Sequence, residues 1–181
     1  MSASALIIID MQVGSFTAAT PRRDADALVA RLNALAARLR QNSGIVIFIQ
    51  HDGPDGDPHH PSLPGWHLLP ALRVLPGDKL ITKTACDAFL DTDLEALLTV
   101  HDIGELIITG CATDYCVDTT VRSALARGYR TTAPSDGHTT ADRAHLNAAQ
   151  IIAHHNAIWA DFIAPGGSAR VRPCAEIAVE R

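Results

Sequence analysis

Short apolar runs alternate along this chain with longer stretches whose apolar residues recur at helical spacing. The apolar runs have the length and continuity of strands buried on both faces, and they occupy residues 5–9, 45–49, 79–82, 105–109 and 129–133. Helical spacing covers residues 24–41, 93–100, 113–127 and 142–155, and a last apolar run at 157–159 predicts a sixth strand. This alternation predicts a three-layer α/β/α fold around a doubly wound, mainly parallel six-stranded sheet.

Two stretches interrupt the pattern. Residues 51–77 are rich in Pro, Gly, Asp and His, which predicts a long irregular loop that lines a site or forms an interface. Residues 163–181 show little pattern, and we expect this tail to lie over a neighbouring subunit or to be partly loose. The length of 181 residues suits one domain with a substantial core, so we expect a single domain over residues 1–181.

Composition narrows the class of protein. With 47% hydrophobic and 19% charged residues, the chain is globular in composition and not disordered. The net charge of −5 and the scattered basic residues give no reason to expect a nucleic-acid partner. No apolar run is long enough for a membrane span, and the first residues do not resemble a secretion signal, so we expect a cytoplasmic location.

The most informative local feature is the turn between the fourth strand and the helix that follows it. Gly110 begins this turn, and Cys116 falls in the first turn of the helix, which Thr113 or Asp114 is expected to cap. The positive end of a helix dipole favours thiolate over thiol, so Cys116 is the predicted nucleophile. Cys111 lies too early to be on the helix, and we interpret it as a small buried residue.

Two charged residues follow other predicted strands. Asp10 follows the first strand and Lys83 follows the third. Because the carboxyl ends of parallel strands meet at one edge of a sheet, both should lie near Cys116. Asp10 can then accept the thiol proton, and Lys83 can compensate the negative charges. Each residue alone has a plainer interpretation as a turn cap, a surface lysine or a core thiol; the combination favours catalysis.

Three segments together resemble a known superfamily. They are LIIIDMQ at residues 6–12, TKT at 82–84 followed by DAF at 87–89, and GCATDYCVDTT at 110–120. In this order they resemble the motifs of the isochorismatase-like cysteine hydrolases, which include nicotinamidases and N-carbamoylsarcosine amidases. The resemblance extends from about residue 4 to residue 159 and implies a Rossmann-like strand order.

The resemblance also implies roles for individual residues. It implies a catalytic triad of Asp10, Lys83 and Cys116, and a cis peptide between Cys111 and Ala112. The amides of Ala112 and Cys116 would form the oxyanion hole. The substrate pocket would be lined by Phe16, Trp66 and Phe89.

These roles predict hydrolysis of a C–N bond in a small amide, lactam or carbamoyl compound through a thioester. The Asp-x-His metal motif of many nicotinamidases is missing at residues 49–53, and the loop histidines lack a spacing diagnostic of metal binding, so we expect neither metal nor cofactor. Residues 50–53 and 64–66 resemble a branch that includes streptothricin hydrolases. The partners expected are a small-molecule substrate and further copies of the chain, in a dimer or tetramer.

Two alternatives stay open from the sequence. One is a vinyl ether hydrolase of the isochorismatase type that uses Asp10 and Lys83 without the cysteine. The other is a non-catalytic protein with a reactive thiol at Cys116.

Overall fold

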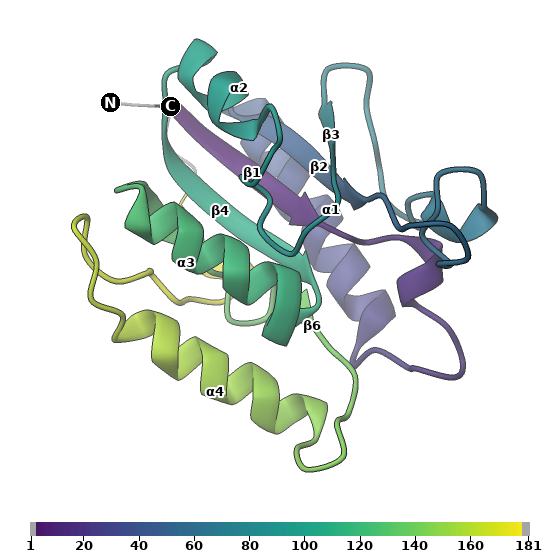
Figure 1. The fold of residues 1–181 in the computed structure, drawn as a ribbon. Helices are drawn as coiled ribbons and strands as arrows, with labels where there is room; N and C mark the ends of the chain where they lie inside the picture. Colours follow the sequence, from purple (N-terminus) through teal and green to yellow (C-terminus); the bar gives the residue numbers. More distant parts are fainter. Residues whose placement is uncertain (1–2, 179–181) are drawn as a thin grey trace.

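The protein is built around a six-stranded sheet, seen in a computed structural model that describes residues 3–178. The strand order is β3–β2–β1–β4–β5, and β6 pairs with the end of β4 (Figure 1). All pairs between these strands are parallel, which confirms the predicted sheet. The strands are β1 (Ala3–Ile9), β2 (Ile45–His51), β3 (Lys79–Lys83), β4 (Ile103–Cys111), β5 (Arg130–Thr132) and β6 (His138–Thr139).

Helices cover both faces of the sheet, as Figure 1 shows. One face packs against α1 (Ala25–Gln41), and the other against α2 (Leu94–Val100), α3 (Asp118–Ala126) and α4 (Ala148–Ala160). Side chains alternate along a strand, so Leu6 and Ile8 join the core beneath α1, whereas Ile7 and Ile9 join the core beneath α2 and α3. The three-layer α/β/α architecture is therefore confirmed.

The predictions for the last helix and the last strand are wrong. α4 begins at Ala148, not at residue 142, because Asn147 and Gln150 form a capping box: the amide of Gln150 donates to Asn147 Oδ1 at 2.9 Å, and the amide of Asn147 donates to Gln150 Oε1 at 3.1 Å. The helix continues to Ala160, so residues 157–159 are helical. Their apolar character reflects helix packing, with Trp159 fully buried, and the sixth strand is β6.

The loop between β2 and β3 is irregular, as predicted, apart from one short 3₁₀ turn, η2 (Pro64–Trp66). The side chain of Gln12 joins this loop to the end of β2. Its Nε2 donates to the carbonyl of His51 at 3.0 Å and to that of Trp66 at 2.9 Å, and its Oε1 accepts from the amide of His51 at 2.8 Å. The loop is thereby held beside the carboxyl ends of the strands.

The described part of the tail packs on its own chain, which corrects the expectation of a loose segment. The amide of Arg170 donates to the carbonyl of Thr131 in β5 at 2.9 Å, and the carbonyl of Arg170 accepts from the amide of Ala133 at 2.9 Å. Further on, Cys174 and Ile177 are buried in the core beneath α1. Residues 179–181 lie outside the described residues.

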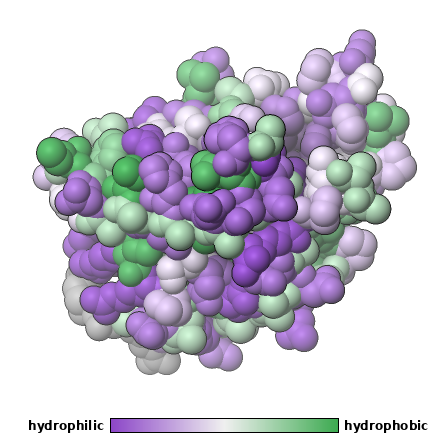
Figure 2. Space-filling model, turned by 90° about the horizontal axis from the view of Figure 1, so that it is seen from below, coloured by the Kyte–Doolittle hydropathy of each residue, from purple (hydrophilic) through white to green (hydrophobic). Residues whose placement is uncertain are grey.

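The surface is mixed in character. On the face in Figure 2, apolar residues form separate spots among polar ones, and that view offers no broad apolar patch. Across residues 3–178, none of the helices combines the length and the apolar character that crossing a membrane requires.

Candidate active site

A cavity of about 280 Å³ lies at the carboxyl ends of the central strands. Its lining includes Asp10 after β1, His51 at the end of β2, and Ala112 and Cys116 after β4. This edge of an open parallel sheet is where such folds collect reactive groups. The cavity is therefore the candidate active site.

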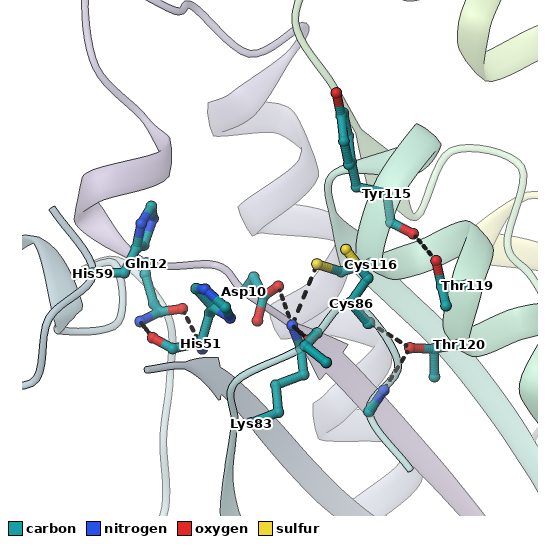
Figure 3. Close-up of polar contacts among 12 residues, drawn as sticks. Asp10, Gln12, His51, His59, Lys83, Cys86, Tyr115, Cys116, Thr119 and Thr120 are labelled. Atoms are coloured by element: carbon teal, nitrogen blue, oxygen red, sulfur yellow. Dashed lines mark hydrogen bonds and ion pairs between the residues drawn. The ribbon is translucent and has the colours of Figure 1, made fainter. Parts of the chain in front are cut away.

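The structure brings together the three residues that the sequence singled out (Figure 3). Lys83, at the end of β3, donates from Nζ to Asp10 Oδ2 at 2.8 Å and to Cys116 Sγ at 3.3 Å. A third bond, to the carbonyl of Ala85 at 2.9 Å, completes the capacity of the ammonium group. The Lys83 side chain is fully buried, and Asp10 is 5% exposed. The lysine is thus a buried bridge between a carboxylate and a sulfur.

The charges of these groups determine their resting protonation. Burial lowers the pKa of Lys83, but the charges of Asp10 and Cys116 and the hydrogen bonds to both outweigh it, and the net pKa lies above the ordinary value. Burial and the charge of Asp10 raise the pKa of Cys116, and Lys83 offsets only part of that rise. At neutral pH the site therefore holds an ammonium group and a protonated thiol.

The positive end of the helix dipole favours thiolate, but it does not decide the pKa of Cys116. Burial and the neighbouring carboxylate dominate the pKa of the thiol, whereas a dipole contributes modestly. Asp10 Oδ1 has no hydrogen-bond partner among the described residues, although it is buried. An acceptor with a free lone pair therefore lies beside a protonated thiol.

The turn that carries Cys116 depends on a close approach between β1 and β4. Gly110 has a φ of 116°, and a Cβ atom there would lie 2.1 Å from the carbonyl oxygen of Ile9. Only glycine fits both the conformation and the space. The peptide bond between Cys111 and Ala112 is cis, as the resemblance implied. The chain then enters a single π-helical turn, η3 (Thr113–Val117), which contains Cys116 and leads into α3.

Neither predicted cap residue caps this helix, because both side chains bind elsewhere. Thr113 Oγ1 lies 2.9 Å from His138 Nδ1 in β6. Asp114 accepts hydrogen bonds from Thr140 at 2.6 Å and from Arg143 at 2.7 Å. These contacts fix the turn against β6 and the segment after it.

The other cysteines differ from Cys116. All four thiols are free, as expected. Cys111 also lines the cavity, but it is 1% exposed, and burial raises its pKa to about 12, so its thiol is unreactive at neutral pH. Cys174 is buried beneath α1, and Cys86 lines the cavity but is exposed. Among the described cysteines, Cys116 alone accepts a hydrogen bond from Lys83.

The three aromatic residues assigned to substrate binding lie outside the cavity lining in the described chain. Phe89 is 5% exposed in the core and stacks on Tyr129 with 5.9 Å between ring centroids. Phe16 packs against the core beneath α1. Trp66 Nε1 donates to Asp52 Oδ1 at 2.7 Å, which fixes the loop. In this structure, Phe16 and Phe89 therefore pack in the core, and Trp66 holds the loop.

The cavity also contains residues that the sequence analysis did not select. Ser15 and Arg22 come from the connection between β1 and α1, where no periodic pattern marks them. Tyr115 and Arg143 also line the cavity, and the guanidinium of Arg143 lies 5.0 Å from the centre of the Tyr115 ring. Within residues 3–178, no group of three or more His, Cys, Asp or Glu side chains is arranged to hold a metal ion.

Comparison with known proteins places this site in a family. Residues 4–161 match the family described as Isochorismatase domain. A streptothricin hydrolase from Streptomyces noursei is 35% identical over 138 residues, which cover 76% of this chain and 55% of the relative. The chain spans about half the length of the streptothricin hydrolases that it matches.

Two further proteins support the assignment. The ureidoacrylate amidohydrolase of Variovorax paradoxus (strain S110) is 27% identical over 164 residues, covering 71% of this chain and 65% of that protein. A crystal structure of an isochorismatase family protein matches with a TM-score of 0.84 and 36% identity, covering 93% of this chain and 96% of the other. The chain therefore belongs to the isochorismatase family of hydrolases.

Proposed function

We propose that this protein hydrolyses a C–N bond in a small amide, lactam or carbamoyl compound, with Cys116 as nucleophile. The observation that carries this proposal is the contact of one buried ammonium group, Lys83 Nζ, with both Asp10 at 2.8 Å and Cys116 at 3.3 Å. A buried lysine needs a strong compensating reason. A site that must stabilise alternating negative charge on a carboxylate and a sulfur supplies it.

The proposed reaction begins with proton transfer from Cys116 to Asp10. The sulfur forms a bond to the carbonyl carbon of the substrate, and the C=O electron pair moves to oxygen. The amides of Ala112 and Cys116, at residues that line the cavity, are the proposed donors to this oxyanion. When the C–N bond breaks, Asp10 returns its proton to the leaving nitrogen.

The second half releases the enzyme. Asp10 accepts a proton from water, whose oxygen attacks the thioester carbon, and the C–S bond breaks to give a carboxylic acid. The sulfur takes the proton back from Asp10. Lys83 stays an ammonium throughout, so that only one of its two neighbours carries a full negative charge at each resting stage.

The relatives favour C–N chemistry. One matched relative bears the name streptothricin hydrolase and another the name ureidoacrylate amidohydrolase. Because the match covers only 55% of the first relative, its substrate is only one candidate for testing here. The homo-oligomer and the cytoplasmic location stay predictions.

Intact-mass spectrometry during turnover of an amide, lactam and ureido panel tests the proposal. We expect an acyl adduct on Cys116, and loss of both adduct and turnover in Cys116→Ala. Cys174→Ala is the matched control, because its thiol is buried beneath α1, outside the cavity lining and the Lys83 contact, and it should keep activity. Turnover that survives in Cys116→Ala would indicate chemistry by Asp10 and Lys83 alone. A clean protein that reacts with alkylating agents but cleaves no compound would indicate a reactive-thiol protein.

A further inference from the structure

Three buried side-chain polar atoms lack a hydrogen-bond partner within residues 3–178. They are Asp10 Oδ1, Arg22 Nη1 and His51 Nδ1. Buried polar atoms are normally paired, because an unpaired one loses its hydration without compensation. All three belong to residues that line the candidate active-site cavity. Asp10 Oδ1 is explained by the proposed proton transfer; the other two atoms are unexplained by the chemistry at Cys116.

Arg22 is held in place by a fixed chain of hydrogen bonds. Its Nε donates to the carbonyl of Ser15 at 2.8 Å. The hydroxyl of Ser15 lies 2.9 Å from His59 Nε2, and His59 Nδ1 lies 2.9 Å from Asp57 Oδ1. Because a carboxylate only accepts, His59 donates from Nδ1, and its second ring nitrogen, Nε2, is hydrogen-bonded to the Ser15 hydroxyl. The carbonyl and the hydroxyl of Ser15 are therefore both hydrogen-bonded. Arg22 Nη1 remains a donor without a partner among the described residues.

His51 is fixed by its backbone. Gln12 bonds both the amide and the carbonyl of His51, at 2.8 and 3.0 Å. The ring lies edge-on to that of His59, with centroids 6.0 Å apart. Burial and the charge of Lys83 lower the pKa of His51, so the ring is neutral at pH 7. Figure 3 shows Asp10 between this ring and the sulfur of Cys116. The imidazole therefore lies across the cavity from the nucleophile.

The charges around the cavity leave one cation uncompensated. Lys83 is paired with Asp10, and Arg143 with Asp114. In the described part of the chain, Arg22 forms no ion pair with a carboxylate. A guanidinium group with a buried unpaired N–H is the side chain best suited to a carboxylate.

We propose that Arg22 and His51 form a carboxylate-binding subsite, so that the substrate is a small amide, lactam or carbamoyl compound that carries a carboxylate. Arg22 Nη1 and His51 Nδ1 donate to the carboxylate while the reactive carbonyl faces Cys116. The cavity volume of about 280 Å³ limits the substrate to a compact molecule. The substrate class rests on the proposed function, whereas anion binding by Arg22 does not.

A binding experiment tests the subsite without turnover. Iodoacetamide alkylation of Cys116 is followed by mass spectrometry, with succinate or dimethyl succinate as the protecting probe. We expect succinate to protect at concentrations at which the diester does not. In Arg22→Gln, protection should need about tenfold to a hundredfold more succinate, the range for one charge-assisted hydrogen bond. The matched control is Arg23→Gln, since Arg23 is the exposed neighbour, with 51% of its side chain accessible, and it should protect as the wild type does.

Turnover of a matched pair tests the substrate class. Succinamate and its methyl ester differ only in the carboxylate, and we expect kcat/KM to favour succinamate by tenfold or more in the wild type, with the preference lost in Arg22→Gln. His51→Phe should lower the same preference, which keeps the test decisive if Arg22→Gln fails to fold. Equal protection by succinate and its diester in the wild type would overturn the subsite. If succinate protects but no amide is cleaved, the subsite stands and the proposed function fails.

Discussion

Protonation of His138 should weaken the fold in a defined pH window. His138 is buried, and its Nε2 lies 3.0 Å from Asn156 Oδ1. Asn156 Nδ2 donates to the carbonyl of Ser135, so Oδ1 must accept, and His138 donates from Nε2. Its Nδ1 then accepts from Thr113, the first residue of η3. A protonated ring would lose this bond and place a charge in the core.

The magnitude follows from the two pKa values. Burial lowers the pKa of His138 from 6.5 to about 4. In the unfolded chain, His138 binds a proton below about pH 6.5. In the folded chain, it binds that proton only below about pH 4. Stability is therefore complete above pH 6.5 and falls as the pH drops, by about 2 kcal/mol at pH 5 and about 3 kcal/mol at pH 4. The charges that face His138, Asp136 and His155, are included in its pKa.

Urea unfolding at pH 7.5 and pH 5.0 measures this effect, with His138→Gln as the comparison. Glutamine offers both a donor and an acceptor but does not titrate. Other groups that titrate in this window, such as His51, are present in both proteins and cancel in the difference. We expect the wild type to lose about 2 kcal/mol more than the variant between the two pH values. An equal loss in both proteins would refute the reasoning.

Three further substitutions act on the candidate site. Asp10→Asn should abolish turnover yet speed alkylation of Cys116 by iodoacetamide at pH 7.5, because a negative charge that raises the thiol pKa is removed; slower alkylation would contradict this. Lys83→Met leaves the carboxylate of Asp10 buried without its cation, so the free energy of unfolding in urea should fall by about 3 to 5 kcal/mol. A loss near zero would argue against a buried ion pair. Gly110→Ala should lower the free energy of unfolding by about 1 to 3 kcal/mol or more, because the φ at this position is positive and the new Cβ would clash with the carbonyl of Ile9. A variant as stable as the wild type would show that β1 and β4 can move apart.

Most of the fold was predictable because each central strand is buried on both faces. Residues 5–9 read as one apolar run, since Leu6 and Ile8 face one helical layer while Ile7 and Ile9 face the other. β6 has only two residues, which is too short to show any hydrophobic period. The sixth strand was therefore predicted at residues 157–159 instead. The start of α4 carried a usable signal, because Asn147 and Gln150 stand at capping-box spacing.

The candidate site was predictable where residues stand at strand ends. Asp10 directly follows β1 and Lys83 is the last residue of β3, and topology brings such positions together. Arg22 could not be predicted, because it lies in an irregular connection and reaches the cavity only through its bond to Ser15. The rise in the pKa of Cys116 could not be predicted from the sequence, because the extent of burial beside Asp10 depends on the whole cavity.

Two charge balances in the cavity explain how a buried thiol can still be a nucleophile. Transfer of the proton from Cys116 to Asp10 moves a negative charge from one neighbour of Lys83 to the other, so the net charge of the trio does not change. Burial is the main cause of the raised pKa of Cys116 and the charge of Asp10 is the second, and this second contribution is lost when Asp10 holds the proton. A substrate carboxylate would instead compensate Arg22, which lines the same cavity. In the proposed mechanism, substrate binding and thiol activation thus use separate cations, and an anionic substrate need not weaken the attacking thiolate.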